Sequence, residues 1–121
     1  MNFTKDYIEL AKDKRIQELK STTSHGDWFC GEKRCPQVTK LNGTKFGDCI
    51  WLPTGDQLDE EIVRICKTVD GGGFIFDYGY RKYPNKFYKS FSVKVGIGGK
   101  EFKVEDDNPL IAKLKLLLEL L

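Results

Sequence analysis

Residues 54–70 are predicted to form an amphipathic helix at the centre of the chain. Thr54 and Gln57 match the capping-box pattern at its start, and the glycines at positions 71–73 are typical of a helix end. One face is apolar and the other is charged, which indicates a helix packed on a sheet. The apolar face consists of Leu58, Ile62, Ile65, Cys66 and Val69.

The second half of the chain alternates between apolar and polar positions, which predicts β-strands. Such alternation covers residues 74–80 and, more regularly, residues 87–97. Gly98-Gly99 suits a two-residue hairpin turn, and this turn would place Val95 opposite Phe102 and Val93 opposite Val104. In the first half, shorter apolar runs predict further strands at 28–30, 38–41, 44–46 and 49–52.

Two more helices are predicted at the ends of the chain. Thr4 can cap a helix that extends to about Lys20 and either curves or breaks near Lys14, where the apolar face changes side. Asn108 before Pro109 predicts the start of the last helix. That helix has few polar residues, so it is either buried deeply or in contact with another chain. Leu116 and Leu120 lie outside its apolar stripe, so they are the candidates for an exposed self-association or partner surface.

These elements predict an α+β fold. It would consist of a largely antiparallel, twisted sheet of about five or six strands, with N-terminal, central and C-terminal helices packed on it. The length of 121 residues and the 40% hydrophobic content predict one domain over residues 1–121. The formal net charge is only +2, so the overall composition gives no electrostatic argument for a nucleic-acid or membrane partner.

The N-terminal residues lack the pattern of a secretory signal, and no apolar run approaches the length needed to cross a bilayer. We therefore expect a cytoplasmic protein. In the cytoplasm thiols stay reduced, so the four cysteines are interpreted as free thiols or metal ligands and not as two disulfides.

Thiolate and imidazole side chains are zinc ligands, and four residues between positions 25 and 49 could supply them. The sequence lacks a second closely spaced cysteine pair, so reduced structural thiols are the competing interpretation and no cofactor is expected. Cysteine–histidine catalysis would need the single histidine beside a thiol, and no other catalytic motif is present. The weak metal candidates are His25, Cys30, Cys35 and Cys49.

Aromatic and basic residues alternate between positions 78 and 89, and this mixture can stack on bases while neutralising phosphates. The competing interpretation is a hairpin whose aromatic side chains enter the core and whose basic side chains are solvated. The nucleic-acid-binding candidates are Tyr80, Arg81, Lys82, Tyr83, Lys86, Lys89, Lys94 and Lys103.

The first half of the chain resembles a group of small proteins encoded by bacteriophages and prophages. The resemblance depends on Gly26-Asp27-Trp28 and on Trp51-Leu52-Pro53-Thr54 followed by Asp56-Gln57-Leu58, with Gly55 where the pattern has glutamine. It implies a phage or prophage accessory protein that acts inside a bacterial host cell. It implies no activity and no site residue.

The sequence therefore predicts a small non-enzymatic protein-binding module with a protein partner, and a homodimer is one form of it. A nucleic-acid-binding protein is the alternative, and a zinc-binding protein is a third hypothesis. No membrane association is expected.

Overall fold

A computed structural model describes residues 3–19, 27–31, 49–69, 74–82 and 89–121 of the chain. The chain divides into two compact units, Met1–Thr54 and Gly55–Leu121. Each unit is described by itself below. The prediction of a single domain over residues 1–121 stays a prediction.

The first unit begins with two short helices, α1 (Lys5–Ala11) and α2 (Lys14–Glu18). Thr4 caps α1 as predicted, because its hydroxyl accepts a hydrogen bond from the Tyr7 amide at 3.2 Å. Of the two alternatives predicted near Lys14, a curve or a break, the structure shows a break. Asp13 causes it by capping a new helix: its carboxylate accepts from the Arg15 amide at 2.9 Å.

Two three-residue strands complete the described part of this unit. Strands β1 (Trp28–Cys30) and β2 (Ile50–Leu52) pair antiparallel, with Phe29 opposite Trp51. Helix α1 packs on β2, and the buried Tyr7 hydroxyl donates a hydrogen bond to the Pro53 carbonyl. This hydrogen bond connects the beginning of the first unit's sequence to its end.

The second unit consists of helix α3 (Gly55–Val69), strands β3 (Phe74–Lys82), β4 (Lys89–Ile97) and β5 (Lys100–Asp106), and helix α4 (Pro109–Leu120). The strands form one antiparallel sheet in the order β3-β4-β5. The register places Val95 opposite Phe102 and Val93 opposite Val104. This confirms the predicted hairpin, and positive φ angles at Gly98 and Gly99 explain why glycines occupy its turn.

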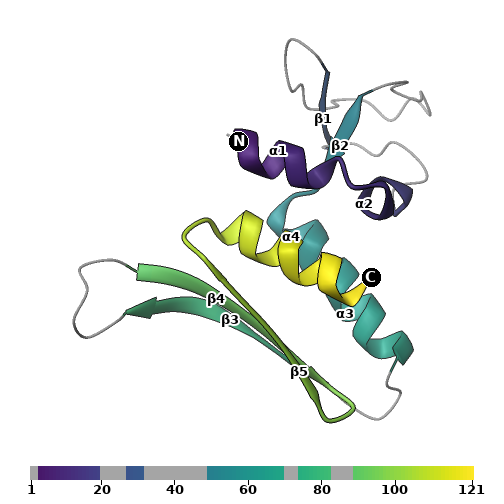
Figure 1. Cartoon of the computed structure of the whole chain (residues 1–121). Coiled ribbons are helices and arrows are strands. Elements are labelled where there is room, and N and C mark those ends of the chain that lie inside the picture. The colour runs from purple at the N-terminus through teal and green to yellow at the C-terminus, as the bar shows by residue number, and fades with distance from the viewer. Residues whose placement is uncertain (1–2, 20–26, 32–48, 70–73, 83–88) are drawn as a thin grey trace. The chain divides into compact units, whose positions relative to one another are not determined.

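Helices α3 and α4 lie side by side, and α4 packs on β4 and β5 (Figure 1). The described apolar stripe of α3 is buried as predicted. Residues that are fully or almost fully buried between the helices and the sheet include Leu58, Ile62, Cys66, Val93, Val95, Leu114 and Leu117. Asn108 caps α4 by accepting from the Leu110 amide at 2.9 Å, so the predicted start of the last helix is confirmed.

The predicted α+β class is confirmed, but the single sheet of five or six strands is wrong for the residues that the structure describes. Those residues form two separate sheets, of two and three strands. Periodicity indicates which segments are extended, but pairing is decided by contacts between distant segments. The predicted strands at 38–41 and 44–46 lie outside the described residues. The described helices number four, because the N-terminal helix breaks at Asp13.

The predicted exposure of Leu116 is wrong, because this side chain is fully buried. Helix α4 contacts both α3 and the sheet, so more than one of its faces is covered. Leu120 is half-buried and remains a surface candidate. Among the described helices, none combines the length and the apolar character needed to cross a membrane.

Burial of Tyr7 predicts that the first unit loses stability in alkaline solution. Burial raises the pKa of Tyr7 well above its usual value near 10, so the folded protein keeps this phenol neutral. Above about pH 10 the phenol ionises more readily in the unfolded state, and stability falls as the pH rises further. We expect Tyr7→Phe to reduce this alkaline loss. Denaturant unfolding of both proteins between pH 8 and 11 measures it, and equal slopes would contradict the prediction.

Candidate binding surface

The largest exposed apolar side chains of the described residues gather on strand β3. Ile75 and Tyr80 are each 63% exposed, and Tyr78 is 48% exposed. Within the described residues β3 is an edge strand, paired only with β4. An edge strand presents unpaired backbone amides and carbonyls. Both main-chain and apolar groups are therefore available along this edge.

The helices cover the sheet unevenly, and this explains why side chains of β3 are exposed. Side chains of a strand alternate between the two faces, and directly paired residues share a face. Tyr78 pairs with Val93 and Tyr80 pairs with Phe91, so both tyrosines lie on the face that the helices cover. Helix α4 lies over β4 and β5, and the edge strand is less covered. The strand alternation thus predicted correctly that the side chains of residues 78 and 80 lie on the helix-covered face of the sheet. It did not predict that these side chains stay exposed there.

Four rings form an aromatic ridge along this part of the sheet, namely Phe76, Tyr78, Tyr80 and Phe91. Tyr80 meets Phe91 edge to face, with ring centroids 5.3 Å apart and an interplanar angle of 79°. Tyr78 lies 5.4 Å from Phe76 and 6.0 Å from Phe91. Such pairs each contribute about 0.5–1.5 kcal/mol beyond their buried area. The ridge is therefore a pre-organised surface in which the exposed tyrosines are held by a buried ring.

A buried lysine supports the ridge from helix α4. Lys113 is only 8% exposed, and its Nζ lies 4.3 Å from the centre of the Tyr78 ring. The same Nζ lies 3.0 Å from Asp59 Oδ1 and 3.1 Å from Asp59 Oδ2. Only the contact with Oδ2 has hydrogen-bond geometry. The Asp59 carboxylate from α3 and the Tyr78 ring from β3 together stabilise the buried positive charge of Lys113 on α4.

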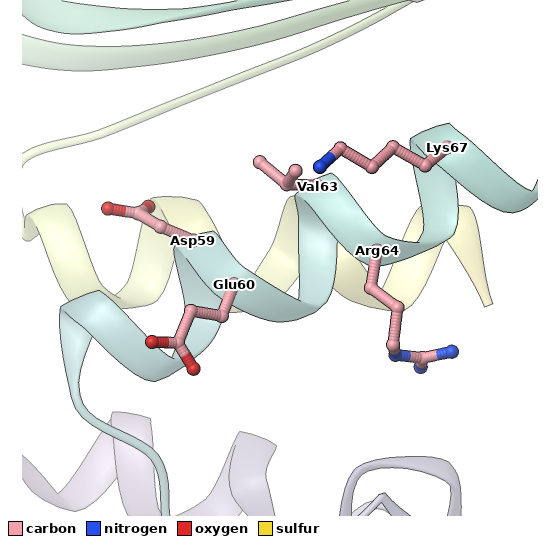
Figure 2. Close-up of a pocket in the computed structure, with 5 residues that line it drawn as sticks. All are labelled: Asp59, Glu60, Val63, Arg64 and Lys67. Carbon is pink, nitrogen blue, oxygen red and sulfur yellow. The ribbon is translucent and has the colours of Figure 1, made fainter.

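A surface hollow of about 440 Å³ lies on α3, and Figure 2 shows the side chains that line it. Asp59, Val63 and Lys67 lie along one side of the helix, and Glu60 and Arg64 point to the other side. Asp59 is already paired with Lys113, and Arg64 donates two hydrogen bonds to Glu61, at 2.7 and 2.9 Å. Two acidic residues of α3, Asp59 and Glu61, are thus engaged in ion pairs within the second unit.

A second hollow, of about 510 Å³, lies where α3 and α4 meet the β4–β5 hairpin. Leu120, the remaining helix candidate, lines it together with Ile65, Ile97 and Phe102. Lys100 and Glu119, of opposite charge, also line it. This hollow is mostly apolar and gives no charge preference for a ligand.

The three nucleic-acid candidates whose side chains the structure describes do not lie on one face of the sheet. Tyr80 lies on the helix-covered face, whereas Lys94 and Lys103 pair with each other and alternate onto the opposite face. Lys94 lies 4.0 Å from Glu101, and Lys103 lies 3.3 Å from Glu105. The structure describes only the backbone of Arg81, Lys82 and Lys89, which belong to β3 and β4. Tyr83 and Lys86 lie outside the described residues.

The interpretation of all cysteines as reduced thiols or metal ligands is wrong for Cys30, which is disulfide-bonded. A disulfide sulfur is not a thiolate and cannot serve as a zinc ligand. The prediction relied on the expected compartment, and the sequence could not show which sulfur atoms approach each other. Cys49 is a free thiol, and His25 and Cys35 lie outside the described residues. The described residues contain no group of three metal-ligating side chains.

Burial raises the pKa of the Cys66 thiol, and its side chain is inaccessible. This agrees with the predicted packing role of Cys66, since an inaccessible neutral thiol is a poor nucleophile.

Comparison with known proteins returned no match to a protein family, a curated protein or a solved structure.

Two features of this surface were not found by sequence reasoning. Ile75 was assigned only to the alternation of a strand, and Lys113 was counted only among the few polar residues of the last helix. A signal was present for Lys113, because it is one of two lysines in the otherwise apolar segment 110–118. A lysine in such a segment indicates a charge that needs a partner if it is buried.

Proposed function

We propose that this chain is a non-enzymatic protein-binding module that receives an extended segment of its partner along strand β3. The observation that carries the proposal is an edge strand with three large exposed apolar side chains, Ile75, Tyr78 and Tyr80. An added strand forms main-chain hydrogen bonds with the edge, and its side chains contact those beside it. Such a strand would extend the sheet from three strands to four.

The length and composition of β3 support this mode of binding. The strand spans Phe74–Lys82, which is long for an uncovered edge. Proteins protect such edges with prolines, inward-pointing charges or covering elements. The segment contains no proline. Apolar side chains occur on both sides of the strand, because Ile75 alternates with Tyr78 and Tyr80.

The distribution of charge favours a protein over a nucleic acid as the partner. Lys94 of β4 and Lys103 of β5 each lie beside a glutamate. They also lie on the face opposite the exposed tyrosines. A phosphate backbone needs free basic side chains beside the stacking rings. Lys113 lies beside the Tyr78 ring, but it is buried and paired with Asp59. The resemblance to phage and prophage proteins makes a bacterial host protein a reasonable partner to seek.

Capture from a phage-infected bacterial lysate tests the proposal. We expect the wild type to retain a specific protein, and the double variant Ile75→Lys/Tyr80→Lys to lose it, because charged edge side chains oppose strand addition. The matched control is Leu121→Lys, since Leu121 is also exposed and apolar but lies at the end of α4. Both substitutions should leave the thermal midpoint close to that of the wild type, since surface changes usually alter stability by less than about 0.5 kcal/mol.

Equal capture by the wild type and the double variant would contradict binding through β3. Retention of nucleic acid, measured by fluorescence anisotropy at low salt and lost in the same double variant, would favour the alternative function.

A further inference from the structure

We propose that the partner strand comes from a second copy of this chain, so that two β3 strands pair antiparallel about a two-fold axis at Gly79. This inference rests on the proposed function and names its partner. Paired in this way, the two three-stranded sheets would join into one continuous sheet of six strands. Two-fold pairing uses the same surface on both copies, as most homodimers do.

Self-pairing about Gly79 matches aromatic residues. An antiparallel pair centred on this residue places Tyr78 of one copy opposite Tyr80 of the other, and symmetry repeats the contact. Both tyrosines are exposed in the single chain. Aromatic pairs across neighbouring strands each contribute roughly 0.2–1 kcal/mol. The aromatic ridge of one copy would therefore continue into that of the other.

The same register also matches charges. It places Asp77 of each copy opposite residue 81 of the other, which is an arginine. Asp77 is exposed and forms no ion pair with any other described residue. Opposite charges directly across a strand pair are stabilising, and like charges are destabilising. The two-fold axis produces this complementary contact twice, which favours a second copy over an unrelated segment.

The centre of the strand leaves room for this arrangement. A Cβ atom added at Gly79 would meet no atom within 4 Å, so the sheet face on the Cβ side of Gly79 is open. Glycine opposite glycine also places no side chain at the two-fold axis.

Charge exchange at positions 77 and 81 tests the inference through sedimentation equilibrium. We expect the wild type to sediment at about twice the 13.9 kDa of one chain. The variant Asp77→Arg would place arginine opposite arginine, and Arg81→Asp would place aspartate opposite aspartate. Each variant alone should shift toward the monomer.

A mixture of the two variants provides the decisive measurement. Asp77→Arg and Arg81→Asp are complementary to each other at both contacts, so an equimolar mixture should regain the dimer. The double variant Asp77→Arg/Arg81→Asp should also dimerise by itself, because it again places an arginine of one copy opposite an aspartate of the other. Circular dichroism of each variant checks that the fold is kept, and recovery in the mixture would itself show that both chains remain folded.

Three outcomes would overturn the inference. They are a monomeric wild type at every concentration up to its solubility limit, single variants that dimerise as well as the wild type, and single variants that are monomeric in the mixture as well. The proposed function has a separate test. If the wild type is monomeric but still captures a protein that Ile75→Lys/Tyr80→Lys loses, self-pairing fails and binding through β3 stands.

Discussion

Replacement of Lys113 by methionine should lower the free energy of unfolding of the second unit by about 2–4 kcal/mol, the cost of leaving one member of a largely buried ion pair alone. The Lys113 side chain is 10% exposed and that of Asp59 is 22% exposed, so water compensates the remaining charge only in part. Methionine keeps most of the apolar length of lysine. The loss would therefore report the missing charge, through its contacts with Asp59 and with the Tyr78 ring.

A double-mutant cycle separates the charge from the packing. Asp59→Leu alone should also destabilise the unit, because it leaves the Lys113 ammonium without its carboxylate. The double variant Lys113→Met/Asp59→Leu should be more stable than the sum of the single effects predicts, since it removes both charges together. Urea unfolding monitored by circular dichroism measures each corner of the cycle. Additive effects would contradict the coupling.

Lys115 supplies a matched control on the same helix. Its Nζ lies 3.3 Å from Asp106 Oδ2, but its side chain is 45% exposed. Lys115→Met should therefore change the free energy of unfolding by less than about 1 kcal/mol, as expected for an exposed ion pair. A loss as large as that of Lys113→Met would show that the helix tolerates no substitution in this turn.

Replacement of Gln17 by methionine should destabilise the first unit by about 2–3 kcal/mol, because several main-chain groups would lose their partner at once. The Gln17 side-chain amide donates to the carbonyls of Trp51 and Ala11, at 3.0 and 2.6 Å. Its Oε1 accepts from the Trp51 amide at 2.9 Å. The side chain thus makes the two hydrogen bonds to Trp51 that a neighbouring strand would make, and it ties α2 to β2.

Glu18→Met is the matched control for this prediction. Glu18 is the next residue of α2, and its side chain is 64% exposed in a loose contact with Lys14. We expect it to change stability by less than about 0.5 kcal/mol. Thermal unfolding of the wild type and both variants, monitored by the fluorescence of the tryptophans at 28 and 51, measures the difference. A Gln17→Met protein as stable as Glu18→Met would contradict the bridging role.

Local signals predicted the elements of the second unit well. Gly98-Gly99 determined the β4–β5 register because a two-residue turn leaves one way to pair the flanking strands, and the structure confirms it. Asn108-Pro109 placed the start of α4 for an equally local reason, since the cap and the first-turn proline act within a few residues. The break of the N-terminal helix near Lys14 was visible as a change of apolar face.

The candidate surface was predicted less well. The sequence identified Tyr80 as a candidate, but it combined this residue with lysines that the strand register places on the other face. It treated Leu116 as exposed, although this residue is buried. It also treated Cys30 as a thiol, although this residue is disulfide-bonded. In each case the property depends on which distant residues lie nearby, and periodicity contains no such information.

By itself the sequence determined the α+β class, the helix caps at Thr4 and Asn108, the hairpin turn and the apolar faces, because these follow from interactions among residues close together in the chain. Only the tertiary structure decided which strands pair outside the β4–β5 hairpin, that Lys113 is buried against Asp59 and Tyr78, and that β3 remains at an edge with Ile75 and Tyr80 exposed. These features depend on where α4 lies over the sheet. The physical reason is that burial and exposure are set by the side chains that one element brings to another, across long separations in sequence.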